Sequence, residues 1–256
     1  MKRISKDSMM NRLRENVFKN MHELETLQSF PNVECFLEGD IGIIVFRPTE
    51  TYCTVSLVMD SGTDLSKISF SELGIDACPQ VVVSVNGCDA LIEERPDIAG
   101  FSYDKTYKSF VKEAGMETGF RWSIRELAPG DQDLAENCTI HAEEERPSFR
   151  EVFTMLIGEK TGRILACVDH DEIVGYLAFV QSIDPLLDVA ELYVKKEYRG
   201  KGIATDLGRK YANTVLSEGK IPYWSNAVSI GSERAAEKSG FSRCCSHLYY
   251  RKAALV

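Results

Sequence analysis

The chain has 256 residues, of which 44% are hydrophobic and 27% charged, a composition typical of globular proteins. Its formal net charge of −9 argues against nucleic-acid binding, because that needs a basic surface to neutralise phosphates. No stretch approaches the roughly 20 apolar residues that span a membrane, and no signal peptide is evident, so we expect a cytoplasmic protein with no membrane partner.

The cysteines and histidines show no metal-binding pattern. The chain has 8 cysteines and 4 histidines, they are scattered, and no C-x-x-C pair occurs. A zinc site would need these residues clustered. We therefore expect free, mostly buried thiols in a reducing compartment, and no metal.

The first half is predicted to be a smaller α/β domain. A helix is indicated by apolar residues at helical spacing, namely Leu13, Val17, Met21, Leu24 and Leu27. Strands are predicted in VECFLE and IGIIVF, joined at Gly39-Asp40, and then in TYCTVSLVMD and PQVVVSVNG. A short helix is predicted over 107–114. No residue of this half carries a motif that indicates chemistry.

A linker is predicted at residues 115–119, GMETG, which carry two glycines and no apolar period. The predicted domains are therefore 1–118 and 119–256. Three interpretations of the first domain stay open: a degenerate copy of the second, a separate lid, and a dimerisation element. If the first domain is a dimerisation element, the protein is expected to form a homodimer.

The second half mixes strands and helices. The predicted elements are a strand at 120–127, a helix at 146–160, a hairpin at 163–180, a strand at 188–194, a helix at 203–219, a strand at 221–228, a helix at 232–240 and a strand at 246–252. The hairpin turns at Asp169-His170-Asp171 and forces an antiparallel pair. The predicted fold class is α/β (α+β), with a mixed, mostly antiparallel sheet flanked by helices.

The run RGKGIA, residues 199–204, lies between a predicted strand and a predicted helix. A helix N-terminus leaves backbone N–H groups without partners, and its dipole favours anions. Gly200 and Gly202 would let the backbone approach a ligand closely, and Arg199 and Lys201 add positive charge. The run fits the pattern [RQ]-x-x-G-x-[GA] and neither the Walker A nor the G-x-G-x-x-G spacing. It indicates a cradle for an oxyanion or a pyrophosphate.

This run, its flanks and SERAAEKSGF at 232–241 together resemble the GNAT superfamily of acyl-CoA-dependent N-acyltransferases. The resemblance covers roughly the C-terminal half. It implies that a pantetheine arm lies between two splayed strands and that the pyrophosphate lies on the loop amides. The coenzyme A-binding residues that it implies are Leu192, Tyr193, Val194, Arg199, Gly200, Lys201, Gly202, Ile203, Ala204, Ser229 and Ser232. It also implies direct attack of an amine on the thioester of acetyl-CoA.

Glu191 is the candidate catalytic base. Alternation along the strand predicts that Glu191 and Tyr193 share one face. A carboxylate beside an apolar wall has a raised pKa, which suits a base near neutral pH. The alternative is a structural hydrogen-bond partner. Asp188 and Asp184 are weaker candidates.

The chain departs from the family pattern at two positions. Many members carry a tyrosine where this chain has Ala236 and an asparagine where it has Ser229. The usual acid for the leaving thiolate is therefore missing, and solvent or a tyrosine could replace it, the candidates being Tyr223, Tyr249 and Tyr250. The acidic run at 143–145 could meet a cationic substrate.

The sequence thus predicts an N-acetyltransferase that moves an acetyl group from acetyl-CoA to a primary amine of a small molecule. Two alternatives stay open. One is a non-catalytic acyl-CoA-binding module, which the departures at Ala236 and Ser229 suggest. The other is a transferase with a different acyl donor, because the cradle would hold only the nucleotide end of the donor.

Overall fold

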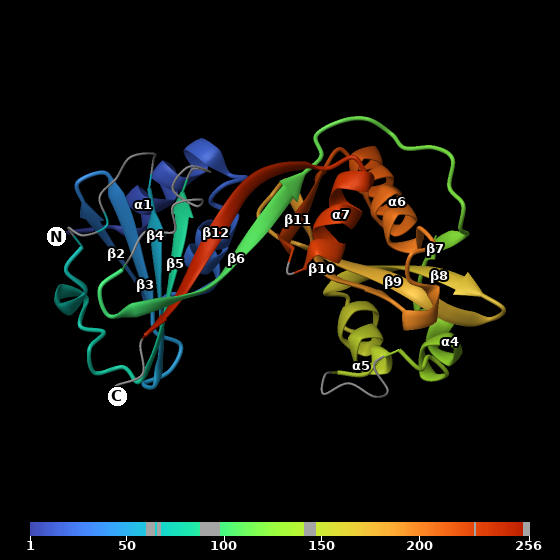
Figure 1. Ribbon diagram of the computed structural model, residues 1–256, viewed down its shortest axis with the longest axis horizontal. Coiled ribbons are helices and arrows are strands. Elements are labelled where there is room, and N and C mark those ends of the chain that lie inside the picture. The colour runs from blue at the N-terminus through green and yellow to red at the C-terminus, as the bar shows by residue number, and fades with distance from the viewer. Residues whose placement is uncertain (60–64, 66–67, 88–97, 141–146, 228, 253–256) are drawn as a thin grey trace. The chain divides into compact units, whose positions relative to one another are not determined.

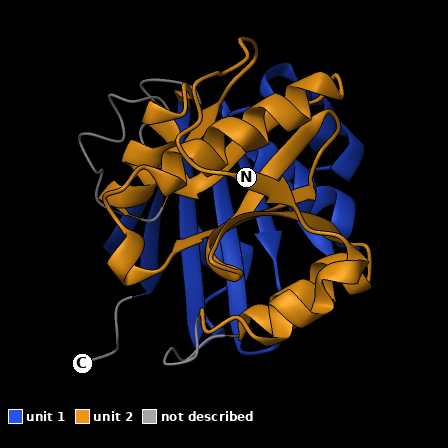
Figure 2. Cartoon of the chain, turned by 90° about the vertical axis from the view of Figure 1, so that its right-hand side faces the viewer, with its two compact units in different colours: residues 1–108, 244–256 blue, residues 109–243 orange. Residues whose placement is uncertain are grey.

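A computed structural model describes residues 1–59, 65, 68–87, 98–140, 147–227 and 229–252. The chain divides into two compact units, which Figure 2 shows in different colours: unit 1 comprises residues 1–108 and 244–256, and unit 2 comprises residues 109–243. This division differs from the single boundary predicted at 118/119. The final residues belong with the first unit, and the predicted linker at 115–119 lies inside unit 2.

Unit 1 is a sheet with helices at its N-terminal end. Its elements are β1 (Lys2–Ile4), α1 (Lys6–Leu13), the 3₁₀ turn η1 (Arg14–Asn16), α2 (Met21–Ser29), β2 (Val33–Glu38), β3 (Ile41–Phe46), β4 (Tyr52–Val58), the 3₁₀ turn η3 (Phe70–Leu73), β5 (Gln80–Gly87), most of β6 (Phe101–Val111) and most of β12 (Ser242–Lys252). The strand order is β1-β2-β3-β4-β5-β12-β6. Neighbours from β1 to β4 are antiparallel, β4 and β5 are parallel, and β5 and β12 are antiparallel.

Two predicted helices of the first half differ from the structure. The helix expected from Leu13 to Leu27 is interrupted between α1 and α2, where the side chain of Asn20 donates a hydrogen bond to the carbonyl of Leu13 over 2.9 Å. The helix predicted over 107–114 is wrong, because Tyr107 and Phe110 belong to strand β6. The i, i+3, i+4 spacing there fits a helical turn, but strand partners distant in the sequence decide the conformation.

Unit 2 is a second mixed sheet. Its elements are β7 (Ile124–Glu126), the 3₁₀ turn η4 (Pro129–Asp131), α4 (Gln132–Glu136), α5 (Phe149–Phe153), the π-helical turn η5 (Thr154–Gly158), β8 (Gly162–Asp169), β9 (Glu172–Gln181), β10 (Leu186–Val194), the 3₁₀ turn η6 (Lys196–Tyr198), α6 (Ile203–Ser217), β11 (Ile221–Ala227) and α7 (Ile230–Lys238). The strand order is β11-β10-β9-β8-β7. All neighbours are antiparallel except β10 and β11, which confirms the mixed, mostly antiparallel sheet.

Helices cover both faces of the sheet of unit 2 (Figure 1). Helices α6 and α7 pack on one face, in a core cluster that contains Leu207 and Trp224, and α4 and α5 pack on the other, with Phe149 against Tyr176. The hydroxyl of Tyr211 on α6 lies 2.5 Å from the carbonyl oxygen of Leu187 and accepts the N–H of Tyr223 over 3.0 Å. Tyr211 thereby fixes α6 over the stretch where β10 and β11 are paired. Within the described residues, no helix is long and apolar enough to cross a membrane.

The segment predicted as a linker is tied to α6. The backbone N–H of Glu117 donates to the Asn213 side chain over 2.8 Å, and its carbonyl accepts from the same side chain over 2.8 Å. The carboxylate of Glu117 also pairs with the buried ammonium of Lys112. These contacts hold a strand-free stretch of chain against the helix.

Replacing Asn213 with alanine is expected to release this segment. The two backbone hydrogen bonds of Glu117 would be lost, so a protease specific for glutamate should cleave after Glu113 or Glu117 several times faster than in the parent chain. Time-resolved mass spectrometry of limited digests measures this rate. Asn137→Ala removes an exposed local bond on α4 and serves as the control. Equal rates in the parent and Asn213→Ala chains would contradict the prediction.

Candidate active site

A gap opens where two parallel strands separate. Among the described residues, β10 and β11 pair only from Leu186 to Asp188, although β10 continues to Val194 and β11 to Ala227. At the last paired position, the carboxylate of Asp188 accepts hydrogen bonds from the Ser225 N–H over 2.9 Å and from its hydroxyl over 2.6 Å. Asp188 therefore links β10 to β11 at the position where the two strands begin to separate.

A bulge reinforces this separation. The pairing of β10 with β9 shifts between Val189 and Glu191, so Ala190 is an extra residue in the strand. A bulge bends a strand and increases its twist. Beyond it, β10 diverges from β11, and among the described residues the strand pairing of β10 continues with β9 only.

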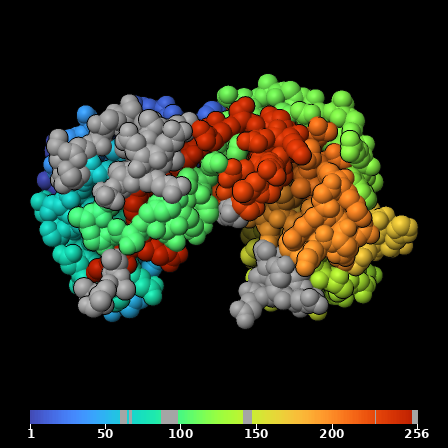
Figure 3. Space-filling view, in the orientation of Figure 1, coloured from blue at the N-terminus to red at the C-terminus, as the bar shows by residue number. Residues whose placement is uncertain are grey.

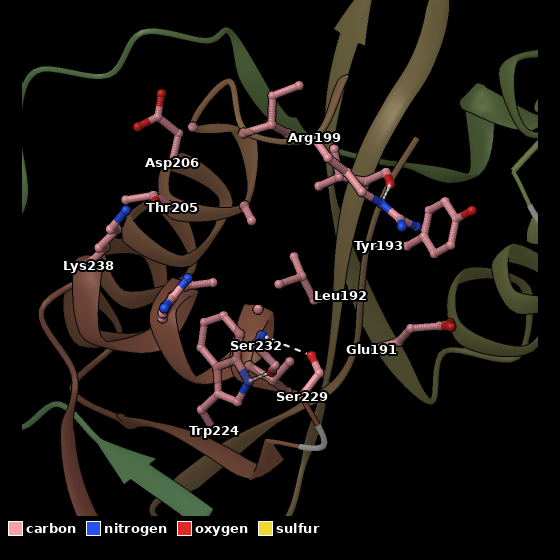
Figure 4. Close-up of a pocket in the computed structure, with 18 of the residues that line it drawn as sticks. Glu191, Leu192, Tyr193, Arg199, Thr205, Asp206, Trp224, Ser229, Ser232 and Lys238 are labelled. Carbon is pink, nitrogen blue, oxygen red and sulfur yellow. Dashed lines mark hydrogen bonds between the residues drawn. The ribbon is translucent and has the colours of Figure 1, made fainter. Parts of the chain in front are cut away.

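A pocket of about 1090 Å³ occupies the gap, lined by β10, the loop that follows it, the first turn of α6, β11 and α7. Figure 4 shows side chains from these elements around it. Ten of the eleven residues predicted to bind coenzyme A line this pocket, and Lys201 is the exception. The structure thus brings together residues that are up to 40 positions apart in the sequence.

The start of α6 has the backbone geometry that the predicted cradle requires, and its binding of an anion stays a prediction. Gly202 is the N-cap with φ +90°, and Gly200 has φ +77°, a region that favours glycine. A Cβ atom built on either glycine would meet no heavy atom within 4 Å, so open space lies above the loop. Within the described residues, the N–H groups of 202–205 have no hydrogen-bond acceptor. An anion placed here would satisfy them and would interact favourably with the helix dipole.

The side chains of Arg199 and Lys201 contact residues of the loop and of the strand before it. Arg199 Nε donates to the carbonyl of Val194 over 3.0 Å, and its guanidinium lies 5.5 Å from the centre of the Tyr193 ring. Lys201 Nζ lies 4.7 Å from the ring centre of Tyr198. The expected contribution of the Lys201 charge to the pocket is therefore not observed, since its side chain stacks on a neighbouring ring.

Cations outside the loop also line the pocket. The sequence interpretation missed Arg234 and Lys238, which are four residues apart on α7, and also Arg209 on α6. Residues of α7, drawn in red, reach the surface of unit 2 in the space-filling view (Figure 3). The i, i+4 spacing of Arg234 and Lys238 could have indicated a cationic face on this helix, because residues four apart lie on the same face.

Asp206 was also missed. It is 2% exposed, and its carboxylate accepts the backbone N–H groups of Arg121 over 2.7 Å and Trp122 over 3.0 Å. The indole N–H of Trp122 in turn donates to the carbonyl of Lys201 over 3.0 Å. Asp206 therefore connects the incoming segment to the first turn of α6, beside the cradle.

The N-terminus of α7 carries the two predicted serines. Ser229 is the N-cap, and its hydroxyl accepts the N–H of Ser232 over 3.1 Å. The hydroxyl of Ser232 accepts the indole N–H of Trp224 over 3.2 Å, as Figure 4 shows. Ala236 is fully buried in the core and does not line the pocket, whereas Ala235 does.

The side chains of Glu191 and Tyr193 lie on one side of β10, and that of Leu192 lies on the opposite side, toward Trp224 (Figure 4). Leu192 packs with the core under α6 and α7, whereas Tyr193 packs with the core under α5, so successive side chains alternate as predicted. Glu191 is partly buried and lines the pocket wall at the edge of β10. The geometry places a carboxylate where the strands separate, and its catalytic role stays a prediction.

The other acid and base candidates lie elsewhere. Asp188 holds Ser225, and Asp184 forms an ion pair with Lys220. None of the three tyrosines proposed as acids lines the pocket: Tyr223, Tyr249 and Tyr250. The acidic run at 143–145 lies outside the described residues.

Two tyrosines do line the pocket, Tyr193 and Tyr198. The Tyr198 hydroxyl donates to Asp169 over 3.0 Å, and this hydrogen bond raises the pKa of Tyr198. A raised pKa keeps this phenol neutral near pH 7. Across the part of the chain that the structure describes, no group of three or more His, Cys, Asp or Glu side chains is arranged to hold a metal ion.

Comparisons with known proteins identify this fold. Residues 129–241 match the acetyltransferase (GNAT) family model. A GCN5-related N-acetyltransferase from Sphaerobacter thermophilus is 14% identical with a TM-score of 0.59, covering 98% of this chain and 94% of its own. A GNAT-family acetyltransferase from Colwellia psychrerythraea is 11% identical with a TM-score of 0.62, covering 98% and 99%. No protein of curated function matches the chain.

A third solved structure is similar over both units. It is a tandem GNAT protein from the clavulanic acid biosynthesis pathway, 13% identical with a TM-score of 0.55, covering 98% of this chain and 97% of its own. At these identities the neighbours establish the fold alone. Together with the family match, they show that residues 129–241 form a GNAT acetyltransferase domain, of a family whose members are typically acyltransferases.

Proposed function

We propose that unit 2 is an N-acetyltransferase that transfers an acetyl group from acetyl-CoA to a primary amine of a small molecule. The observation that carries the proposal is the cradle at the start of α6, which opens on the gap between β10 and β11. We also propose a cytoplasmic location, because the described cysteines are free thiols.

The residues of the pocket suit coenzyme A. The N–H groups at 202–205 would donate to an anion, and Arg209, Arg234 and Lys238 line the same pocket with positive charge. The edge of β10 that faces the gap would offer backbone groups to the amides of a pantetheine arm. Because Arg199 already binds the carbonyl of Val194, we expect such pairing to involve mainly residues before Val194.

Glu191 would prepare the acceptor. A primary amine is protonated at neutral pH and cannot attack until that proton leaves, and Glu191 would take it directly or through water. The bound thioester supplies the acyl group. A thiol has a pKa of about 8.5, so its thiolate leaves readily near neutral pH even though Ala236 offers no acid.

A non-catalytic acyl-CoA-binding module is the second candidate. It is favoured by the alanine at position 236, where many members of the family carry a tyrosine, so that α7 offers no hydroxyl at this position. Such a module would bind acetyl-CoA with the same cradle and release no thiol.

The release of free thiol from acetyl-CoA, scanned over a library of small amines, tests the two candidates. We expect thiol release that depends on one class of amine and that yields the acetylated amine by mass spectrometry. Calorimetry with acetyl-CoA on the same preparation provides the matched measurement. Tight binding without turnover on any amine would favour the module, and the absence of binding would contradict both candidates.

A further inference from the structure

Strands β4 and β5 of unit 1 have an apolar face and a more polar face. Alternate residues of β4 and β5, such as Val55 and Val83, are fully buried in the core cluster of the unit. The intervening residues on the other face include the hydroxyl-bearing Thr54, Ser56 and Ser84. Ser84 donates to Ser56 over 2.9 Å across the paired strands. A sheet face that only packed against a helix would be expected to be apolar.

A pocket of about 450 Å³ lies on this polar face. It is lined by α2, β4, β5 and β12, all within unit 1, and the residues that matter here are Glu23, Glu25, Thr54, Ser84 and Tyr249. This volume suits a small molecule. The lining residues that the structure describes include two carboxylates and neither lysine nor arginine.

Glu23 forms the buried end of the pocket. It is 2% exposed, and its carboxylate is approached by its own backbone N–H and by Asn86 Nδ2, the latter over a long 3.4 Å. Asn86 is fully buried, and its Oδ1 has no hydrogen-bond partner among the described residues. A buried carboxylate with so little hydrogen bonding costs free energy unless a donor completes it. An unsatisfied acceptor lies beside it.

The pocket is not a second coenzyme A site. In unit 1 the parallel strands β4 and β5 pair along their whole length, from Tyr52 opposite Gln80 to Val58 opposite Asn86. They therefore leave no gap like that between β10 and β11. The two carboxylates of the pocket, Glu23 and Glu25, would also repel the negative charge of a pyrophosphate.

We propose that this pocket binds a small organic cation, with an ammonium or guanidinium group paired to Glu23 and its polar groups hydrogen-bonded to the hydroxyls of Thr54 and Ser84. The buried carboxylate, the described lining without lysine or arginine, and the hydroxyl groups of the wall all suit such a ligand. The proposal concerns unit 1 and is independent of the acetyl transfer proposed for unit 2, so its readout is binding.

Protonation of Glu23 should control this binding. Burial raises the pKa of Glu23 to about 7, so the free carboxyl is half protonated near neutral pH. A cation binds the ionised form, so affinity should be constant well above pH 7 and fall about tenfold per pH unit well below it.

Other groups face the same region. They are Lys19, whose ammonium donates to the carbonyl of Met59, with His22, Tyr52, His247 and Tyr249. Burial lowers the pKa of His247 to about 3 and raises that of Tyr249, so both are neutral between pH 5.5 and about 8.5. His22 and Glu25 also line the pocket, and Glu23→Gln separates the effect of Glu23 from theirs.

Calorimetric titration of the full-length chain with ethanolamine, putrescine and agmatine, and with acetate as the anionic control, tests the proposal. We expect at least one amine to bind and acetate not to bind. Glu23→Gln should weaken the best amine by about tenfold to a hundredfold and abolish the pH dependence. Glu15 is exposed, and Glu15→Gln should leave the amine affinity and its pH dependence unchanged.

Thr54→Val removes one hydroxyl from the pocket wall while keeping its shape, and it should weaken the same amine severalfold. This variant tests the pocket if Glu23→Gln does not fold, as judged by thermal unfolding. The proposal is overturned if no amine binds, if neither folded variant weakens binding, or if the pH dependence persists in Glu23→Gln.

Discussion

Replacing Glu191 with glutamine is expected to lower kcat by about 10²–10⁴-fold and to leave acetyl-CoA affinity nearly unchanged. Glutamine keeps the shape and the hydrogen-bonding capacity of the side chain and removes its basicity. The side chain of Glu191 points away from the cradle at 202–205, which lies on the opposite side of β10. Donor binding should therefore not depend on this carboxylate. Part of the lost rate should return at high pH, where more of the amine is unprotonated.

A pH–rate profile of both proteins on the active amine measures this effect. Asp184→Asn is the matched control, because Asp184 is an exposed carboxylate whose partner is Lys220 and which lies outside the pocket. We expect the control to keep the parent kcat. A Glu191→Gln enzyme with the parent kcat and an unchanged acidic limb would remove Glu191 from the mechanism. A solvent relay would then have to take the proton.

Short-range signals in the sequence predicted most of the strands. The turn at Gly39-Asp40 joins β2 and β3, and Gly39 has φ +56°. The hairpin turn of β8 and β9 is also confirmed, with positive φ at His170 and Asp171. Each of these turns is decided by residues next to it in the chain, so its pattern can be recognised locally.

Long-range pairing could not be predicted in this way. Ser246 lies opposite Gly87 in the pairing of β12 with β5, so the last strand belongs to the first unit. No composition shift marks this return of the chain. The glycines at 115–119 signalled a break in periodicity, but the side chain of Asn213 holds that break within unit 2.

The candidate site was predictable to a similar extent. Gly200 and Gly202 could be recognised because two glycines separated by one residue, directly before a helix, indicate a turn with positive φ angles. Asp206 could not, because a buried carboxylate in the first turn looks like any acidic N-terminal residue until its partners are known. The orientation of Lys201 depends on the ring of Tyr198, which residue type alone does not determine.

Replacing Gly202 with aspartate is expected to weaken coenzyme A binding by at least about tenfold, because a charge-assisted contact is worth roughly 1.5–3 kcal/mol. The new side chain would project into the open space above the loop, and its negative charge would oppose a pyrophosphate on the N–H groups of α6. Calorimetry with coenzyme A measures the change, and thermal unfolding checks that the variant is folded.

Gly202→Ala separates the charge from the backbone strain. At φ +90° any L-residue is strained, so both variants should lose stability, by about 1–2 kcal/mol, but only aspartate adds charge. We therefore expect Gly202→Ala to bind coenzyme A more tightly than Gly202→Asp. At low salt the gap between the two variants should widen, because screening of the added carboxylate weakens. A folded Gly202→Asp chain with unchanged affinity would exclude the cradle as the pyrophosphate site, and an equal loss in both variants would assign the effect to loop geometry.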